Sequence, residues 1–273
     1  MSAPLAFTVL MAVYDGDDPG FFEEAVASAY ANDCQPDDFV LVVDGPVRAV
    51  LQARIVACAE THGLRVIWLP KNQGLAKALN AGLSEVRTEW VARADADDIN
   101  LPDRFAKQIS FIEARNGAVD LLGGAIEEID EDDRVVATRM MPTDEVEIQR
   151  FARRRNPFNH MTVVYRTELV RQAGGYPALH LREDYGLWAR LLIMGCRVGN
   201  LPDIVVRARA GGAMLRRRGG WKYATTEYQL QRYLFKLGFK SLWEAGFHLL
   251  MRSAVFVAPN FIRKIVYTKF LRS

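Results

Sequence analysis

The sequence predicts an α/β fold built on a mostly parallel, doubly wound sheet, and three observations support this class. Short apolar runs of strand length recur through residues 6–118. Between them lie segments whose apolar residues return every three or four positions, as on one face of a helix. Polar or glycine-containing turns separate the two kinds of segment. Strict alternation of this kind is typical of a parallel sheet covered by helices on both faces.

The elements of this first half can be predicted in order. A continuous apolar run predicts a buried strand over residues 6–14, and Pro19 can open the helix that follows. Further strands are expected over residues 39–43, 65–69 and 90–94. The helices after these four strands should bury one apolar stripe each: Phe22, Val26 and Ala29; Leu51, Ile55 and Cys58; Leu75, Leu79 and Leu83; and Phe105, Ile109 and Ile112.

After about residue 118 the alternation becomes less regular. Strands are predicted over residues 119–124, 161–165 and 204–206, and a hairpin with a charged turn is predicted from residues 125–129 and 135–139. A helix should start at Glu183 and stop at Gly195. We therefore expect one domain over residues 1–220, with halves of about 1–118 and 119–220, and a C-terminal helical extension over 221–273.

Composition limits the function classes. The chain has 273 residues and a net charge of +2, which does not suggest a nucleic-acid-binding protein. The three cysteines lack metal-ligand spacing, so reduced thiols and a cytoplasmic location are expected. No basic segment precedes the first apolar run, so no signal peptide is expected, and no apolar stretch reaches the roughly 18 residues of a membrane-spanning helix.

Three carboxylates follow the strand predicted over residues 90–94. Asp95, Asp97 and Asp98 should lie at the carboxyl end of that strand, where open α/β sheets bind their ligands. Gathered carboxylates repel one another, and a divalent cation that carries a phosphorylated substrate would relieve the repulsion. The alternative is an acidic turn that caps the helix opened by Pro102.

Two other strand ends carry polar residues. Asp44 ends the second strand and could accept a hydrogen bond from a nucleobase N–H or a ribose hydroxyl, or it could be a turn residue before Gly45. Residues 72–74, Asn72 to Gly74, could let the backbone approach a nucleotide, or could simply start a helix.

Glu183 and Asp184 open a predicted helix, and Trp188 lies one turn further on. A carboxylate in such an apolar pocket can act as a general base, although two acids at a helix start can also be explained by the helix dipole. His160 stands alone in its segment and fits a structural or supporting role better than a catalytic one. Arginine runs at residues 153–155 and 216–218 fit solvated surfaces or phosphate contacts.

Taken together, these segments resemble a family-2 glycosyltransferase with the GT-A fold. The similar segments occur in the order and at the spacing of that family: residues 9–14, 41–46, 71–80, 94–98 with 102–105, and 182–188. Residues 156–160 and 217–221 also resemble amylovoran and related exopolysaccharide biosynthesis enzymes. Where the family often has two acids after the second strand, this chain has Asp44 alone.

The resemblance implies an inverting, metal-dependent enzyme that transfers a sugar from a UDP-sugar to a lipid-linked glycan acceptor in bacterial polysaccharide assembly. It implies that Asp97 binds Mn²⁺ or Mg²⁺ and that Asp184 is the general base. The acceptor-side residues it implies are Glu183, His160 and Trp188. The donor-binding residues it implies are Tyr14, Asp44, Asn72, Gly74, Lys77, Asp95, Asp97 and Arg217.

The C-terminal region lies outside these segments. After Glu244 the chain has no acidic residue, and apolar and basic residues interleave over residues 240–273. This composition is typical of amphipathic helices at an anionic membrane surface, here the inner face of the cytoplasmic membrane, although such helices also pack on protein cores.

Two other function classes stay open. A nucleotidyltransferase also uses carboxylate-bound Mg²⁺, but residues 9–18 lack the glycine-rich phosphate loop expected of one. A binding scaffold without turnover would not need to retain both Asp97 and Asp184.

Overall fold

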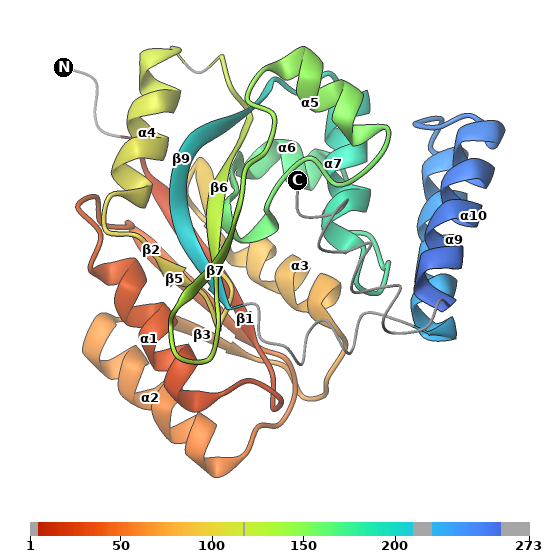
Figure 1. The fold of residues 1–273 in the computed structure, drawn as a ribbon. Coiled ribbons are helices and arrows are strands. Elements are labelled where there is room, and N and C mark those ends of the chain that lie inside the picture. The colour runs from red at the N-terminus through yellow and green to blue at the C-terminus, as the bar shows by residue number, and fades with distance from the viewer. Residues whose placement is uncertain (1–4, 117, 210–219, 258–273) are drawn as a thin grey trace.

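The computed structural model describes residues 5–116, 118–209 and 220–257, and within these ranges the strands form one sheet (Figure 1). Its order is β3-β2-β1-β4-β8-β6-β9-β5, and β7 pairs with β6. The strands are β1 (Phe7–Val13), β2 (Asp38–Val43), β3 (Arg65–Trp68), β4 (Trp90–Arg93), β5 (Ile99–Asn100), β6 (Leu121–Ile129), β7 (Val135–Arg139), β8 (Val164–Arg166) and β9 (Val198–Arg209).

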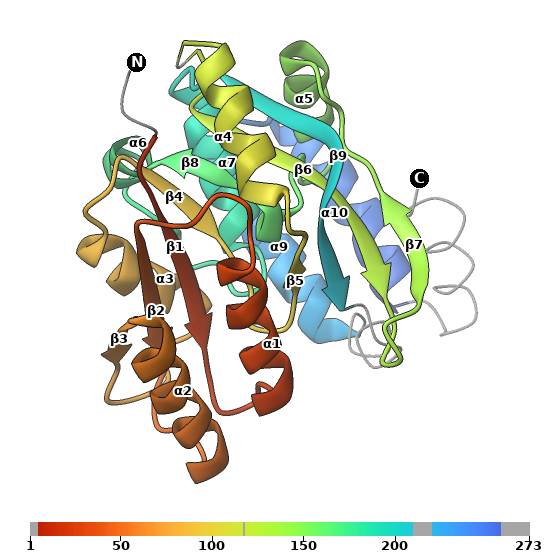
Figure 2. The same ribbon diagram turned by 90° about the vertical axis from the view of Figure 1, so that its left-hand side faces the viewer.

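Helices cover both faces of the sheet. Figure 2 looks onto α1 (Pro19–Tyr30), α2 (Ala49–His62) and α4 (Arg104–Ala114), which share one apolar layer with the sheet. The other face packs against α3 (Leu75–Glu85), α6 (Thr167–Gln172) and α7 (Glu183–Ile193). This arrangement confirms the predicted α/β class with helices on both sides of the sheet.

The first four strands in chain order are parallel to one another, as predicted from their apolar runs. Local sequence signals determine where the helices between these strands begin and end. The Asp18 carboxylate accepts hydrogen bonds from the backbone N–H groups of Gly20 and Phe21 at the start of α1, and Pro19 fills its first turn. Gly63, with a φ of 74°, ends α2 in the left-handed conformation.

The second half of the sheet is mixed. β8 runs antiparallel to β4 and β6, whereas β6 and β9 are parallel and β6 and β7 form the predicted hairpin. The strand predicted over residues 161–165 starts later, because a 3₁₀ turn, η1 (His160–Thr162), precedes it. The strand predicted over residues 204–206 is longer, since β9 continues through Pro202 with a shift of register against β6. The helix α5 (Glu145–Ala152) was not predicted.

The C-terminal extension contains α9 (Trp221–Lys236) and α10 (Leu242–Val257), which pack side by side (Figure 1). Leu230 and Leu234 of α9 are fully buried against Tyr185 and Ala189 of α7. A buried carboxylate also links these elements, since Glu227 lies 3.3 Å from Arg182, the residue before α7, and 3.6 Å from Arg252 of α10. The extension is therefore packed on the helix that begins at Glu183.

Candidate active site

The acidic loop that follows β4 is held at both ends by the sheet. β4 lies between β1 and β8, and β5, directly after the loop, pairs with β9. Within the loop, Nε of the buried Arg93 side chain donates a hydrogen bond of 3.1 Å to Oδ1 of Asp95. Burial alone would raise the pKa of Asp95, but Arg93 and His160 together hold that pKa well below its usual range. Asp95 is therefore a fixed anion.

The next two carboxylates differ in their partners. Asp98 is buried and its Oδ1 accepts a hydrogen bond of 3.0 Å from the backbone N–H of Arg209. Asp97 is exposed, and no described side chain is bonded to its carboxylate. The residue reaches solvent, but partial desolvation of its carboxylate raises the pKa of Asp97, and the charge of Asp95 raises it further. Among the described residues, only the backbone of Asp97 itself bonds to this carboxylate, in a place where a cation would relieve repulsion.

These residues fit a magnesium or manganese site that is completed by substrate. Hard divalent cations prefer oxygen ligands, and Mg²⁺ is often held by one or two carboxylates plus phosphate oxygens. Within the described ranges, no three His, Cys, Asp or Glu side chains gather closely enough to enclose a metal ion. The carboxylate of Asp97, which no described side chain bonds, thus fits a cation that would take further ligands from a diphosphate and water.

The loop after β1 approaches the acidic loop. The Asp17 carboxylate accepts a hydrogen bond of 2.9 Å from the backbone N–H of Tyr14, and burial, with added repulsion from Asp97 and Asp95, raises the pKa of Asp17 to about 7. The Tyr14 ring covers Gly16, where an added Cβ would lie 2.4 Å from the ring. The sequence pointed to Tyr14 but not to Asp17, whose one signal was its place after an apolar strand.

Asp44 has a structural task in the described fold. Its two carboxylate oxygens accept hydrogen bonds of 2.8 Å each from the backbone N–H groups of Gln73 and Gly74. Gly45 lets the two loops meet, because a Cβ there would lie 2.3 Å from the backbone nitrogen of Asn72. Asp44 therefore fixes the turn that opens α3, where Asn72 and Lys77 are exposed. Its contact with a nucleobase stays a prediction.

Asp184 lies in the first turn of α7 and is held on several sides. Its Oδ2 accepts a hydrogen bond of 3.0 Å from the side-chain amide of Asn156, and its Oδ1 accepts one of 2.7 Å from the backbone N–H of Tyr185. Burial would raise the pKa of Asp184, but the hydrogen bond with His160 and the charges of His160 and Arg93 lower it overall. Asp184 is therefore ionised, as a general base must be before it accepts a proton.

His160 joins the acidic loop to Asp184. Its Nε2 lies 2.9 Å from Oδ2 of Asp95, and its Nδ1 lies 3.3 Å from Oδ2 of Asp184. Burial works against a charged ring, yet the charge of Asp95 and the hydrogen bonds with Asp184 and Asp95 raise the pKa of His160 to about 10. The structure thus brings together three residues that the sequence singled out separately, and adds Arg93 and Asn156, which it did not.

Two residues expected on the acceptor side are placed differently from Asp184. Trp188 is fully buried and packs edge-on against Phe158 and Tyr176, so the expectation that it faces an acceptor needs correction. One helical turn separates it from Asp184, but that turn carries it into the core rather than to the surface. Glu183 is also buried, and burial together with the charge of Asp184 raises its pKa.

The basic residues expected either on solvated surfaces or at phosphates come from two segments, and of these residues 153–155 lie among the described residues. Arg217 lies outside the described residues. Arg153 is engaged elsewhere, since it pairs with Glu244 at 2.6 Å and also donates to the backbone oxygen of Phe239. Arg153 therefore links the end of α5 to the C-terminal helices.

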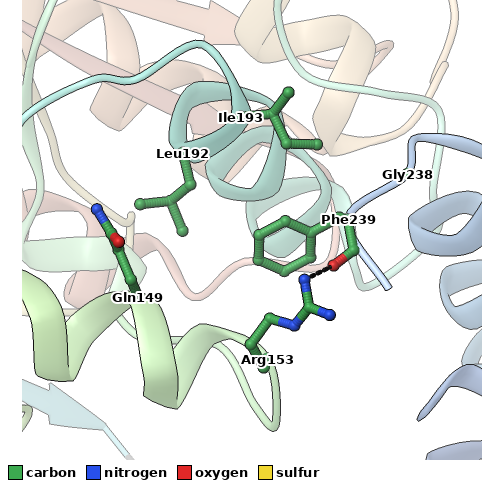
Figure 3. Close-up of a pocket in the computed structure, with 6 residues that line it drawn as sticks. All are labelled: Gln149, Arg153, Leu192, Ile193, Gly238 and Phe239. Atoms are coloured by element: carbon green, nitrogen blue, oxygen red, sulfur yellow. Dashed lines mark hydrogen bonds between the residues drawn. The ribbon is translucent and has the colours of Figure 1, made fainter. Parts of the chain in front are cut away.

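A cavity of about 240 Å³ lies beside Arg153, between α5, α7 and the turn that joins α9 to α10 (Figure 3). It is lined by Gln149, Arg153, Leu192, Ile193, Gly238 and Phe239. Leu192 lies eight residues beyond Asp184, about 12 Å along α7 at 1.5 Å per residue. Because its lining has no carboxylate, this cavity is separate from the acidic site.

Comparison with known proteins identifies relatives over nearly the whole chain. The family model described as glycosyl transferase family 2 matches residues 8–174. An amylovoran biosynthesis glycosyltransferase of Erwinia amylovora is 39% identical, over 96% of this chain and 98% of its own length. A UDP-Gal:α-D-GlcNAc-diphosphoundecaprenol β-1,3-galactosyltransferase of Escherichia coli is 33% identical, over 97% of this chain and 96% of its own length.

Solved structures share the fold at lower identity. The crystal structure of residues 1–349 of S. aureus TarS in complex with UDP-GlcNAc matches with a TM-score of 0.69 and 20% identity, over 97% of this chain and 76% of that one. A mannosyltransferase of Pyrobaculum calidifontis, in complex with GDP-Man and Mn²⁺, matches with a TM-score of 0.62 and 18% identity, over 98% of this chain and 78% of that one. At these identities the structures bear on the fold, and they agree with the GT-A fold expected from the sequence.

Proposed function

The chain belongs to glycosyl transferase family 2 and is a glycosyltransferase, and from this premise we propose that it is an inverting, metal-dependent enzyme. It transfers a sugar from a UDP-sugar to a lipid-linked glycan in the assembly of a bacterial exopolysaccharide, capsule or O-antigen. The similarity to the galactosyltransferase of Escherichia coli, which is named for a UDP-sugar donor and a diphosphoundecaprenol-linked acceptor, supports these choices.

The single observation that carries the proposal is the meeting of Asp184 with the acidic loop. His160 contacts both Asp95 and Asp184, so a carboxylate suited to accept a proton lies next to one suited to a donor site. A transferase needs both groups in one place, because the acceptor hydroxyl must meet the anomeric carbon of a bound donor.

In the proposed reaction, Asp184 takes the proton from the acceptor hydroxyl as the oxygen attacks the anomeric carbon. The bond to the UDP oxygen breaks on the opposite face, so a single displacement inverts the anomeric configuration. Asn156 and the backbone N–H of Tyr185 hold Asp184 in place for this step. Asp97 would hold Mn²⁺ or Mg²⁺, which when bound stabilises the charge that develops on the leaving diphosphate.

A single ionised base supports inversion over retention. A double displacement through a covalent glycosyl–enzyme intermediate needs a nucleophile on the face of the sugar ring opposite the leaving group. It also needs a group that activates the acceptor. Asp95 is ionised but is bonded to Arg93 and His160. Burial and the charge of Asp184 raise the pKa of Glu183, the carboxylate before Asp184, and make it a poor nucleophile. Asp184 as a lone base is the simpler assignment.

The donor site predicts nucleotide-selective stabilisation by UDP. With UDP at about 100 times its Kd, binding to the folded state should add about 2.7 kcal/mol to the free energy of unfolding. We expect the melting temperature to rise with UDP and Mn²⁺ together, and much less with GDP, dTDP or CDP, or with UDP and a chelator. Thermal denaturation of the purified protein measures this. A larger shift with GDP or dTDP would mean that the donor carries that nucleotide instead of UDP. No shift with any nucleotide would contradict the donor site.

We also propose that α10 contacts the membrane that carries the acceptor. Within the described chain, no helix combines the length and the apolar character that crossing a bilayer requires. However, one face of α10 exposes three large apolar side chains within two helical turns. These are Trp243, Phe247 and Leu250, which are 88%, 62% and 70% exposed. The sequence beyond Glu244 contains basic but no acidic residues, which favours an anionic surface.

Replacing Trp243, Phe247 and Leu250 together with Ser should therefore weaken binding to vesicles that contain phosphatidylglycerol. Inserting such side chains is worth about 1.5 kcal/mol or more each when fully buried, so even partial insertion predicts a roughly hundredfold loss of affinity. Co-sedimentation measures the binding, and the matched control replaces Val135 and Val136, exposed apolar residues of β7, with Ser. Equal binding by the triple variant and the wild type would contradict the membrane contact.

A further inference from the structure

The geometry around His160 assigns this residue a task that the proposed reaction does not yet include. Both ring nitrogens face a carboxylate: Nε2 is 2.9 Å from Asp95 and Nδ1 is 3.3 Å from Asp184. An ionised carboxylate can only accept hydrogen bonds, whereas a neutral imidazole has one donor and one acceptor. Both contacts can be hydrogen bonds when His160 carries a proton on each nitrogen.

We propose that His160 is a doubly protonated clamp that holds the base Asp184 at a set distance from Asp95 of the donor loop, and that it is a positioning residue for transfer. This inference rests on the proposed function, since it presumes that Asp184 is the base and that Asp95 belongs to the donor site. The clamp determines how the base Asp184 is positioned relative to Asp95, which the separate roles of the two residues do not specify.

The surroundings of His160 fix both ends of the clamp. Asp95 is anchored by Arg93, which is fully buried in β4 and also has Tyr176 beside its guanidinium at 5.8 Å from the ring centroid. Asp184 is anchored by Asn156 and by the backbone of Tyr185. His160 itself begins the turn η1, whose Thr162 hydroxyl donates to the backbone oxygen of Asn159. The imidazole therefore joins two rigid groups rather than two mobile side chains.

The clamp gives the base two properties. It fixes the carboxylate of Asp184 at the donor, and positioning errors of about 1 Å can cost a hundredfold in rate. It also places a positive charge beside Asp184, which keeps that carboxylate ionised although burial opposes this. Among the described residues, Arg93 of β4 has the same effect on Asp184, whereas Glu183 of α7, when ionised, and Asp95, across the imidazole, oppose it.

The kinetic test compares His160→Ala and His160→Gln with the wild type. For His160→Ala we expect kcat for transfer to fall about a hundredfold with little change in KM for the donor, because Arg93 still holds Asp95. The acidic limb of the profile of kcat against pH should move to higher pH, because Asp184 loses its cationic neighbour. His160→Gln can donate to one carboxylate, so it should recover part of kcat while its acidic limb stays shifted.

His62→Ala, a histidine stacked on Tyr30 at the end of α2, is the matched control for loss of a histidine. Unchanged kcat and an unchanged pH profile in both His160 variants would overturn the clamp. Loss of the UDP-dependent rise in melting temperature in a folded His160→Gln protein would also overturn it, because His160 would then serve the donor pocket.

A second measurement needs no substrate, so it separates the clamp from the proposed reaction. Nitrogen-15 NMR of the wild-type protein at about pH 8 should show both ring nitrogens of His160 protonated, although an ordinary histidine with a pKa of about 6.5 is neutral there. A neutral ring at that pH would overturn the clamp even if transfer from a UDP-sugar were confirmed. A protonated ring in a protein that transfers no sugar would agree with the clamp but contradict the proposed function.

Discussion

Replacing Asp184 with Asn is expected to lower the rate of sugar transfer by roughly 10²–10⁴-fold, the range that a well-placed general base contributes. The amide has nearly the size of the carboxylate, and its single oxygen can keep one of the two hydrogen bonds that the separate oxygens of Asp184 accept from Asn156 and Tyr185. What it cannot do at neutral pH is take up the proton of an acceptor hydroxyl. The measurement is the initial rate with saturating UDP-sugar and acceptor.

Donor binding separates this effect from a damaged fold. The rise in melting temperature with UDP and Mn²⁺ should persist in Asp184→Asn, because this change leaves the acidic loop in place. Glu60→Gln, which removes one exposed carboxylate from α2, should transfer sugar at the wild-type rate. Should Asp184→Asn keep more than about a tenth of the wild-type rate, general-base catalysis would have to come from another residue, since the loss would fall below the expected range.

The first half of the fold could be predicted because local signals and tertiary packing agree there. Buried parallel strands read as continuous apolar runs, and Pro19 and Gly63 mark the start of α1 and the end of α2. In the second half the signals conflict. Pro202 and Asp203 interrupt the apolar character of β9, yet the strand continues through them beside β6 with a shift of register. The extent of β9 is therefore determined by its pairing with β6 rather than by its local sequence.

The acidic residues of the site could be predicted one by one, but their assembly could not. His160 contacts Asp95 across 65 positions of sequence, and no local motif marks a histidine whose partners come from two distant segments. Arg93 had one visible signal, a charged residue inside an otherwise apolar strand, which in a buried position requires a partner.

Two assignments show how spacing along a helix can mislead. Trp188 follows Asp184 by one turn, which brings it close in space but leaves its direction to the packing of α7, and that packing buries it beside Phe158. Asp44 ends an apolar strand at the ligand edge of the sheet, as expected, yet both of its oxygens bond to the backbone of the turn before α3. Position at the edge was predictable, whereas the partner of each side chain depended on neighbouring loops.

Asp97→Asn should remove most of the stabilisation that UDP and Mn²⁺ give together. Asp97 is the exposed carboxylate of the acidic loop, whereas Asp95 is bonded to Arg93 and His160 and Asp98 to the backbone of Arg209. A neutral amide binds hard cations less strongly than a carboxylate, so a roughly hundredfold weaker Kd would reduce a stabilisation of about 2.7 kcal/mol to about 0.4 kcal/mol. In a chain of this size, 1 kcal/mol corresponds to roughly 2–4 °C in Tm.

The contrast between Asp97 and Asp184 is the sharpest test of the division between donor and acceptor sides. Asp97→Asn should lose both the metal-dependent shift and transfer, whereas Asp184→Asn should lose transfer alone. Asp97→Asn should melt near the wild-type temperature without nucleotide, because no described side chain depends on its carboxylate. If UDP stabilised Asp97→Asn as strongly as the wild type in the presence of Mn²⁺, the cation would have to be held elsewhere, and Asp97 would be an exposed acid of the loop with no part in donor binding.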